Sequence, residues 1–152
     1  MKDDVIVRQA GPDDLNETAV LFNEYRKFYR QPSDLDGAAA YLRERFDRQE
    51  SVIFVAEDVS TCRMVGFTQL YPSFSSISMR RVWILNDLFV SEPDRGRGVA
   101  QRLLDRAKAL AVETNAKGLS LSTAADNVAA QRLYERNGFV RDTDFYDYFL
   151  TL

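Results

Sequence analysis

The sequence contains no histidine and one cysteine, and both scarcities narrow the chemistry open to it. Without histidine, Ser-His-Asp triads, Cys-His pairs and nearly all zinc-enzyme ligand sets are excluded. Cys62 alone cannot form an internal disulfide or a cysteine metal cluster. We therefore predict no metal site, and any acid–base catalysis falls to carboxylates, tyrosine, lysine or water.

The sequence also lacks a strong charge excess and a long hydrophobic run. The 20 Lys and Arg against 23 Asp and Glu give a net charge of −3, which argues against nucleic acid as the main partner. No apolar run approaches a membrane span, and the residues from Met1 to Asp4 lack the apolar core of a signal peptide. We expect no nucleic-acid or membrane partner and a cytoplasmic location. With 152 residues, 45% of them hydrophobic, residues 1–152 are predicted to form one domain.

The stretch at residues 83–104 carries the most information. Residues 82–90 are rich in β-branched, aromatic and aliphatic side chains, which predicts a buried strand. An RGRG sequence follows at residues 95–98, and apolar residues then recur every three or four positions, which predicts an amphipathic helix. Strand, glycine loop and helix N-terminus together predict an anion site, because free N–H groups and the helix dipole favour negative charge. The two loop arginines suit a phosphate.

The loop fits neither common nucleotide motif. A dinucleotide fingerprint needs a third glycine where Gln101 stands, and a P-loop needs lysine where Val99 follows Gly98. Residues 95–100 instead read R-x-x-G-x-A. This pattern resembles the pyrophosphate loop of the GNAT (Gcn5-related) N-acetyltransferase superfamily, which binds acetyl-coenzyme A. A strand-to-helix turn with glycines for close packing is the alternative.

The rest of the chain predicts an α/β (α+β) fold. The expected order is β-α-α-β-β-β-α-β-α-β-β, with a mixed central sheet of six or seven strands and helices on both faces. The expected helices cover residues 12–29, 34–48, 99–111 and 127–137. The expected strands cover residues 5–9, 51–57, 64–71, 81–90, 119–123, 139–140 and 145–150.

A second motif supports the resemblance. Residues 127–139, NVAAQRLYERNGF, match the family pattern N-x-x-A-x-x-L-Y-x-x-x-G-F. Two motifs in the right order, with the element order, identify the chain as a member of the GNAT superfamily over nearly its whole length. The strand LNDLFV, preceded by FTQLYPSF, is similar to the branch of polyamine and yeast Hpa-type acetyltransferases.

The resemblance implies where acetyl-CoA binds. The central strand would splay from its neighbour at a bulge near residues 87–90, freeing backbone groups for the pantetheine amides and the thioester carbonyl. The residues implied to contact acetyl-CoA are Leu88, Phe89, Val90, Arg95, Gly96, Arg97, Gly98, Val99, Ala100 and Asn127. Arg97, Arg102 or Lys108 would meet the 3′-phosphate or be solvated surface residues. Asn127 would also serve as a helix N-cap.

The resemblance also implies a general acid, and the chemistry requires a base. Tyr134 would protonate the departing sulfur, unless it is only a core tyrosine at helical spacing with Ala130. An alkylammonium with a pKa of about 10.4 is neutral in roughly one molecule per thousand, so the amine needs a base. Relatives in this branch often have glutamate where Asn86 stands, which leaves Asp87 as the nearest candidate or as a structural residue. Tyr148, Glu57 and bound water are the remaining options.

The predicted function is transfer of the acetyl group of acetyl-CoA to a primary amine of a small molecule, by direct attack in a ternary complex. A polyamine, an amino acid or a related amine is expected, with protein lysine or N-terminal acetylation and a non-catalytic acyl-CoA module as alternatives. The aromatic, basic residues 25–33 either wall the substrate cleft or pack under the first helix. The acidic residues 142, 144 and 147 either face a dibasic amine or lie in solvent. Residues 145–150 and the PSF loop at 72–74 are expected to form a homodimer contact.

Overall fold

The structure, a computed structural model, describes residues 4–152. The prediction that residues 1–4 are not part of a signal peptide falls largely on residues 1–3, which lie outside the described residues. The chain divides into two compact units, Met1–Leu121 and Ser122–Leu152, and each is described by itself. That the whole chain acts as a single domain stays a prediction.

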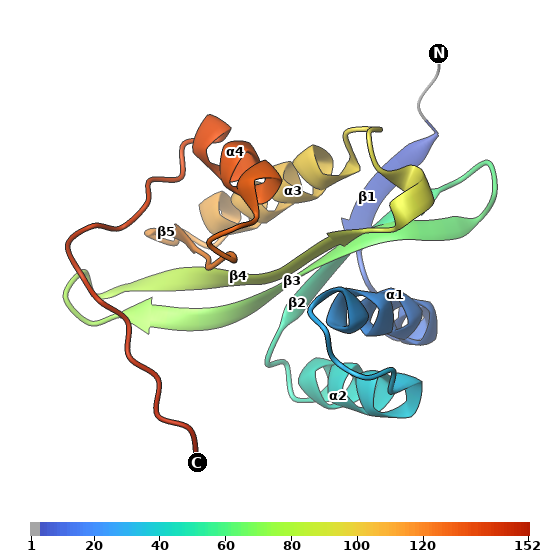
Figure 1. The fold of residues 1–152 in the computed structure, drawn as a ribbon, viewed down its shortest axis with the longest axis horizontal. Coiled ribbons are helices and arrows are strands. Elements are labelled where there is room, and N and C mark those ends of the chain that lie inside the picture. Colours follow the sequence, from blue (N-terminus) through green and yellow to red (C-terminus); the bar gives the residue numbers. More distant parts are fainter. Residues whose placement is uncertain (1–3) are drawn as a thin grey trace. The chain divides into compact units, whose positions relative to one another are not determined.

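A five-stranded mixed sheet forms the centre of the first unit, in the order β1-β2-β3-β4-β5 (Figure 1). The strands are β1 (Val5–Gln9), β2 (Val52–Asp58), β3 (Arg63–Ser75), β4 (Arg80–Val90) and β5 (Gly118–Ser120). Neighbours from β1 to β4 are antiparallel, whereas β5 runs parallel to β4 after the crossover through helix α3. The predicted α/β class and mixed sheet are confirmed.

Helices cover both faces of this sheet, as the sequence predicts (Figure 1). Helices α1 (Leu15–Phe28) and α2 (Leu35–Asp47) pack on one face, and α3 (Val99–Glu113) packs on the other. Proline in the short 3-10 turn η1 (Pro12–Asp14) introduces α1, and the Asp34 side chain caps α2 by accepting from Gly37 N at 2.9 Å. The core beneath α1 and α2 includes Phe22, Leu42 and Phe67.

Close packing of α3 on the sheet depends on Gly66 of β3. A Cβ atom at this position would lie 2.9 Å from the Phe89 carbonyl oxygen and 3.2 Å from Val99 Cγ1. The missing side chain therefore lets the first turn of α3 approach the sheet, where Val99 and Leu103 are buried. Val99, the residue that follows the glycine loop, is therefore buried against the sheet.

Strand β4 changes its pairing at Asn86. Leu85 lies opposite Leu70 and Asp87 lies opposite Gln69, so Asn86 is an extra residue on β4. On the other side, β5 pairs with β4 only from Val82 to Ile84. Among residues 4–152, no strand pairs with residues 85–90 on this edge. The splay is present, and the bulge lies one residue before the predicted range.

The second unit contains helix α4 (Val128–Arg136). The helix ends at a left-handed glycine: Gly138 has φ of +90°, and its N–H donates to the Glu135 carbonyl at 3.1 Å. The rest of the unit, residues 139–152, holds no strand. The two C-terminal strands expected at residues 139–140 and 145–150 are therefore wrong for this structure.

The physical reason is that strand propensity forms a strand only where a partner strand pairs with it. The second unit contains no strand to pair with FYDYFL among its described residues. Asp142 also bends the chain there, because its carboxylate accepts from the N–H groups of Asp144 at 2.9 Å and Phe145 at 3.2 Å. The sheet therefore has five strands, fewer than predicted, and β5 is two residues shorter than expected.

Candidate active site

The end of β4 brings together residues that the sequence assigns to acetyl-CoA binding. Leu88, Phe89 and Val90 pair with Thr68, Phe67 and Gly66 of β3 along one edge. The opposite edge of these residues has no strand partner in the described part of the chain. An unpaired edge can accept an extended amide chain as an added strand. The geometry required for pantetheine binding is therefore present, while the binding itself stays a prediction.

The loop at residues 95–98 has the conformation that its glycines predict. Gly96 has φ of +83° and Gly98 has φ of +74°, a region that favours glycine. Gly98 precedes α3, and the first intrahelical bond joins its carbonyl to Arg102 N at 3.2 Å. The N–H groups of Val99 and Ala100 belong to the first turn, which has no intrahelical acceptors for them. Strand, loop and helix start form the predicted anion-site geometry.

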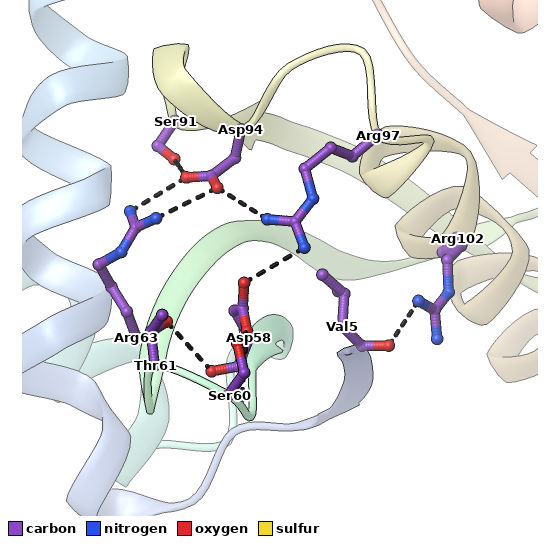
Figure 2. Close-up of polar contacts among 9 residues, drawn as sticks. All are labelled: Val5, Asp58, Ser60, Thr61, Arg63, Ser91, Asp94, Arg97 and Arg102. Carbon is purple, nitrogen blue, oxygen red and sulfur yellow. Dashed lines mark hydrogen bonds and ion pairs between the residues drawn. The ribbon is translucent and has the colours of Figure 1, made fainter. Parts of the chain in front are cut away.

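Arg95 joins the loop to the strand and to α1. Its Nε donates to the Val90 carbonyl at 3.1 Å, and its guanidinium lies 5.5 Å from the Phe89 ring centroid and 5.9 Å from that of Phe28. Arg102, a candidate for the 3′-phosphate, donates to the Val5 carbonyl at 2.5 Å (Figure 2). Both side chains therefore have contacts within the first unit before any ligand binds.

A polar network that was not predicted from the sequence underlies the loop (Figure 2). We call it the Asp94 network; its members are Asp58, Arg63, Ser91, Asp94 and Arg97. Arg97 binds Asp94 at 2.9 Å and Asp58 at 3.2 Å. The Asp94 carboxylate also accepts from Arg63 at 3.0 and 3.2 Å and from the Ser91 hydroxyl.

Both carboxylates of this network are poorly exposed: the Asp94 side chain is 4% accessible and that of Asp58 is 9%. Burial opposes ionisation of Asp94, but hydrogen bonds from Ser91 and Arg63 outweigh it and hold its pKa below the ordinary value. The Ser60 hydroxyl is the main cause of the lowered pKa of Asp58, with Arg97 contributing. Both groups are therefore carboxylates at neutral pH.

Asp87, the candidate base, lies on the sheet face that α1 and α2 cover. It is 3% exposed, and its carboxylate accepts from Gln69 Nε2 at 2.8 Å and from Asn86 Nδ2 at 3.1 Å. Burial raises the pKa of Asp87, while hydrogen bonds from Gln69, Tyr25 and Asn86 act in the opposite direction. These hydrogen-bond partners are all uncharged. Asp87 is thus a buried carboxylate held by neutral donors, within the part of β4 that has no strand partner on its second edge among the described residues.

Two tyrosines, Tyr25 of α1 and Tyr71 of β3, lie near this carboxylate. Tyr25 of α1 donates to the Asn86 carbonyl at 3.3 Å, and its ring packs edge-on at 6.0 Å from both Phe67 and Phe89. Tyr25 therefore packs beneath its helix and reaches β4, as one interpretation of residues 25–33 expects, while their role as the wall of a substrate cleft stays a prediction. Tyr41 and Tyr71 share a hydroxyl–hydroxyl bond of 2.6 Å.

Burial, the bond to Tyr41 and the nearby charge of Asp87 raise the pKa of Tyr71. Gln69, Tyr41 and Tyr71 were missed at the sequence level. They lie on different elements, and only their pairing in the fold reveals the cluster.

The remaining two predicted site residues belong to the second unit. The Asn127 side chain accepts from Ala130 N at 3.2 Å, which confirms its role as the N-cap of α4. Tyr134 is half-buried, with its ring edge-on to Phe139 at 5.7 Å between centroids. Its role as general acid, and any contact of Asn127 with acetyl-CoA, stay predictions.

The described residues contain neither a metal-binding cluster nor a membrane-spanning helix. Residues 4–152 hold no group of three or more His, Cys, Asp or Glu side chains arranged to bind a metal ion. Within the same residues, every helix is too short or too polar to cross a membrane.

Comparison with known proteins gives consistent matches. The model of the family described as "Acetyltransferase (GNAT) family" matches residues 18–139. The chain is 50% identical over 146 residues to the uncharacterized N-acetyltransferase YhfO of Bacillus subtilis, covering 96% of this chain and 97% of the relative. It is 24% identical over 147 residues to the D-amino-acid N-acetyltransferase HPA3 of Saccharomyces cerevisiae, covering 96% and 91%. A solved structure of a probable acetyltransferase superposes with a TM-score of 0.91 at 44% identity, covering 97% of both chains.

Proposed function

Because the chain belongs to the acetyltransferase (GNAT) family, we propose that it transfers the acetyl group of acetyl-CoA to the primary amine of a small molecule. The observation that carries this proposal is the position of Asp87. Among the described residues, β4 has no strand partner on one edge from residue 85 to residue 90, and this buried carboxylate lies within that stretch, next to Leu88. A base and a binding edge for an acyl thioester are therefore adjacent in one strand.

In this proposal the first unit binds the cosubstrate through its backbone. The pantetheine arm adds to the open edge of β4, and an N–H from residues 88–90 polarises the thioester carbonyl. The pyrophosphate binds at the N-terminus of α3, where N–H groups and the helix dipole favour an anion. The amine then attacks the carbonyl carbon directly, and the acetyl group passes from sulfur to nitrogen without an enzyme-bound intermediate.

Asp87 is proposed to remove the proton that the amine must lose. A base works best when its pKa is near the working pH, and burial raises the pKa of Asp87 toward that range. Gln69 supports both of the protonation states that this role requires. Its Nε2 donates to the carboxylate, and its buried Oε1 has no hydrogen-bond partner. Rotation of the amide by half a turn would direct that oxygen at a protonated Asp87.

Tyr134 is proposed as the acid that protonates the leaving sulfur. A thiol with a pKa of about 8.5 makes thiolate a tolerable leaving group, so this proton matters less than that of the amine. Loss of the Tyr134 hydroxyl is expected to slow turnover by roughly 10²-fold, at the lower end of general acid catalysis.

The acceptor is proposed to be a small amine, with amino acids as the first compounds to test. The C-terminal half of α1 carries Arg26, Lys27 and the aromatic residues around Tyr25. This arrangement suits an acceptor that bears a carboxylate beside its amine better than a polycation. The yeast relative HPA3, whose name gives D-amino acids as its substrates, supports the same choice.

The test is acetyl-CoA-dependent release of free thiol against amino acids, polyamines and lysine peptides. Asp87→Asn is expected to lower kcat/KM by about 10²–10⁴-fold on the best amine, the usual range for losing a general base. Asp47→Asn, which removes an exposed carboxylate from the end of α2, is the matched control and should not change the rate. Full activity of Asp87→Asn would contradict the base. Absence of thiol release with every amine would contradict the proposed reaction.

A further inference from the structure

The Asp94 network places two carboxylates beneath a loop that is expected to bind an anion. Asp58 ends β2, and Asp94 belongs to the short turn η2 (Glu92–Asp94) between β4 and the glycine loop (Figure 2). Buried negative charge near a phosphate site opposes binding unless cations neutralise it. Arg63 and Arg97 supply the two compensating charges. The guanidinium of Arg97 is therefore already bound to carboxylates in the structure.

The two bonds of Arg97 run to different segments. One joins it to Asp94, three residues earlier in the chain, and the other joins it to Asp58, 39 residues earlier. Because Arg97 lies between Gly96 and Gly98, which have the freest backbones of the loop, these bonds restrict a segment that would otherwise be mobile. Arg63 fixes Asp94 in turn from β3. The loop is thus anchored to β2, β3 and η2.

We propose that Asp58 and Asp94 are positioning residues for the cosubstrate. Their ion pairs with Arg97 fix the position of the loop, so that the backbone N–H groups at the start of α3 are preorganised for the pyrophosphate. Arg97 acts through the position of its backbone, and its side chain is not a phosphate ligand. This inference rests on the proposed function, because it requires a coenzyme A thioester as the ligand.

The proposal predicts an effect opposite in sign to that of simple electrostatics. Asp58→Asn removes one negative charge near an anion site, which by charge alone should tighten the binding of coenzyme A. The same change weakens the anchor of Arg97 while the amide can still accept from Ser60 N, as Asp58 does at 3.0 Å. If the position of the loop has a larger effect on affinity than the charge of Asp58, the Kd for coenzyme A rises, roughly tenfold to a hundredfold. The reason is that a small misplacement of a positioned group can lower function about 10²-fold.

The experiment measures binding of coenzyme A and of pantetheine by titration calorimetry, using the full chain. Asp58→Asn, Asp94→Asn and Arg97→Met are each expected to weaken coenzyme A binding and leave pantetheine, which lacks the pyrophosphate, unaffected. In the double variant Asp58→Asn/Arg97→Met the loss should be no larger than in Arg97→Met alone, because both changes break one anchor. Kinetically, KM for acetyl-CoA should rise with kcat nearly constant.

Glu113→Gln is the matched control, because it also removes one negative charge and one ion pair, the exposed contact of 3.4 Å with Arg106. It should leave both affinities unchanged. Unchanged or tighter coenzyme A binding by Asp58→Asn and Asp94→Asn would overturn the inference, as would an equal loss for pantetheine. Asp58 is the last residue of β2, and its Asn variant can keep the bond from Ser60 N, so this variant tests the inference if Asp94→Asn fails to fold. A wild-type chain that binds no coenzyme A would instead overturn the proposed function itself.

Discussion

At the scale of single residues, the neutral surroundings of Asp87 determine how it affects stability. A carboxylate that is buried without a cation destabilises the folded state, and its pKa is therefore raised. The folded protein gains from the protonated form, and this gain is present below the unfolded pKa of about 3.9 and is lost as the pH rises through the folded pKa.

Asp87→Asn is therefore expected to unfold at a higher temperature than the wild type at pH 7–8 while losing activity. Each gain of about 1 kcal/mol would raise Tm by roughly 2–4 °C in a chain of this size. The difference should shrink as the pH falls, because the raised pKa lets Asp87 take up a proton in the folded wild type before the unfolded chain would. Thermal unfolding between pH 4 and 8 checks this. A variant with a lower Tm at pH 8 would show that the carboxylate stabilises the fold.

Gln69 is expected to control the pH dependence of the reaction. Gln69→Met keeps the volume of the side chain and removes the donor that lowers the pKa of Asp87. The pKa of Asp87 should rise, so the acid limb of the kcat/KM profile should move to higher pH. Tyr41→Phe is the control, because it breaks the contact with Tyr71 and leaves the bonds to Asp87 in place. An acid limb that stays in place in Gln69→Met would rule out this role.

The residue scale is also where prediction from the sequence was least complete. Asp87 could be named because it lies in a strand next to a recognisable loop. The sheet face on which Asp87 lies could not be predicted, because the alternation of side chains along the strand is interrupted where Asn86 inserts an extra residue. Gln69 and Tyr71 could not be found at all, since their contacts depend on the register between β3 and β4. The Asp94 network depends in the same way on three segments that meet only in the fold.

At the scale of elements, local signals were read correctly where the chain itself supplies the partner. The Asn127 cap of α4 and the bounds of α2, expected at residues 34–48 and observed at Leu35–Asp47, follow from residues within a few positions of one another. Strands 139–140 and 145–150 failed because their partner would have to come from elsewhere, and Asp142 bends the chain between them. Interactions between residues that are close in the sequence can be predicted from it, whereas the pairing of strands that are distant in the sequence cannot.

The glycine loop gives a prediction at this scale. Gly98→Ala forces a side chain into φ of +74°, which destabilises the protein by about 1–2 kcal/mol and disturbs the start of α3. Both Tm and the affinity for coenzyme A should fall. Gly118→Ala is the control, because a Cβ there meets no atom within 4 Å and the backbone does not have a positive φ. Equal effects of the two substitutions would contradict a conformational origin.

At the scale of the whole molecule, the tip of the β3–β4 hairpin is an apolar surface that needs an explanation. Phe74, Ile77 and Met79 are 72%, 96% and 88% exposed. Strand β3 pairs with β2 only as far as Leu70, so the hairpin extends beyond that neighbour. Exposed apolar clusters of this kind commonly mark contacts with other protein molecules. The homodimer expected from the sequence remains a prediction, and this tip is one surface that could form it.

Light scattering after size-exclusion chromatography tests the dimer. The wild type is expected to elute as a dimer, and Ile77→Lys with Met79→Lys should make it a monomer with unchanged Tm, because neither side chain is buried in the chain itself. Val112→Lys, at an 81% exposed position on α3, should leave the dimer intact. A wild type that is monomeric at all concentrations would contradict the prediction.

The early end of the β4–β5 pairing has a consequence for the dynamics of the backbone. Amide protons at residues 88–90 that point away from β3 have no strand acceptor among the described residues, so they should exchange with deuterium from the solvent readily. In the proposed complex, pantetheine supplies the missing acceptors, and exchange at these few amides should slow markedly. Pantetheine would then act as an added strand beside β4, and the backbone of residues 88–90 would become fully hydrogen-bonded only when the cosubstrate binds.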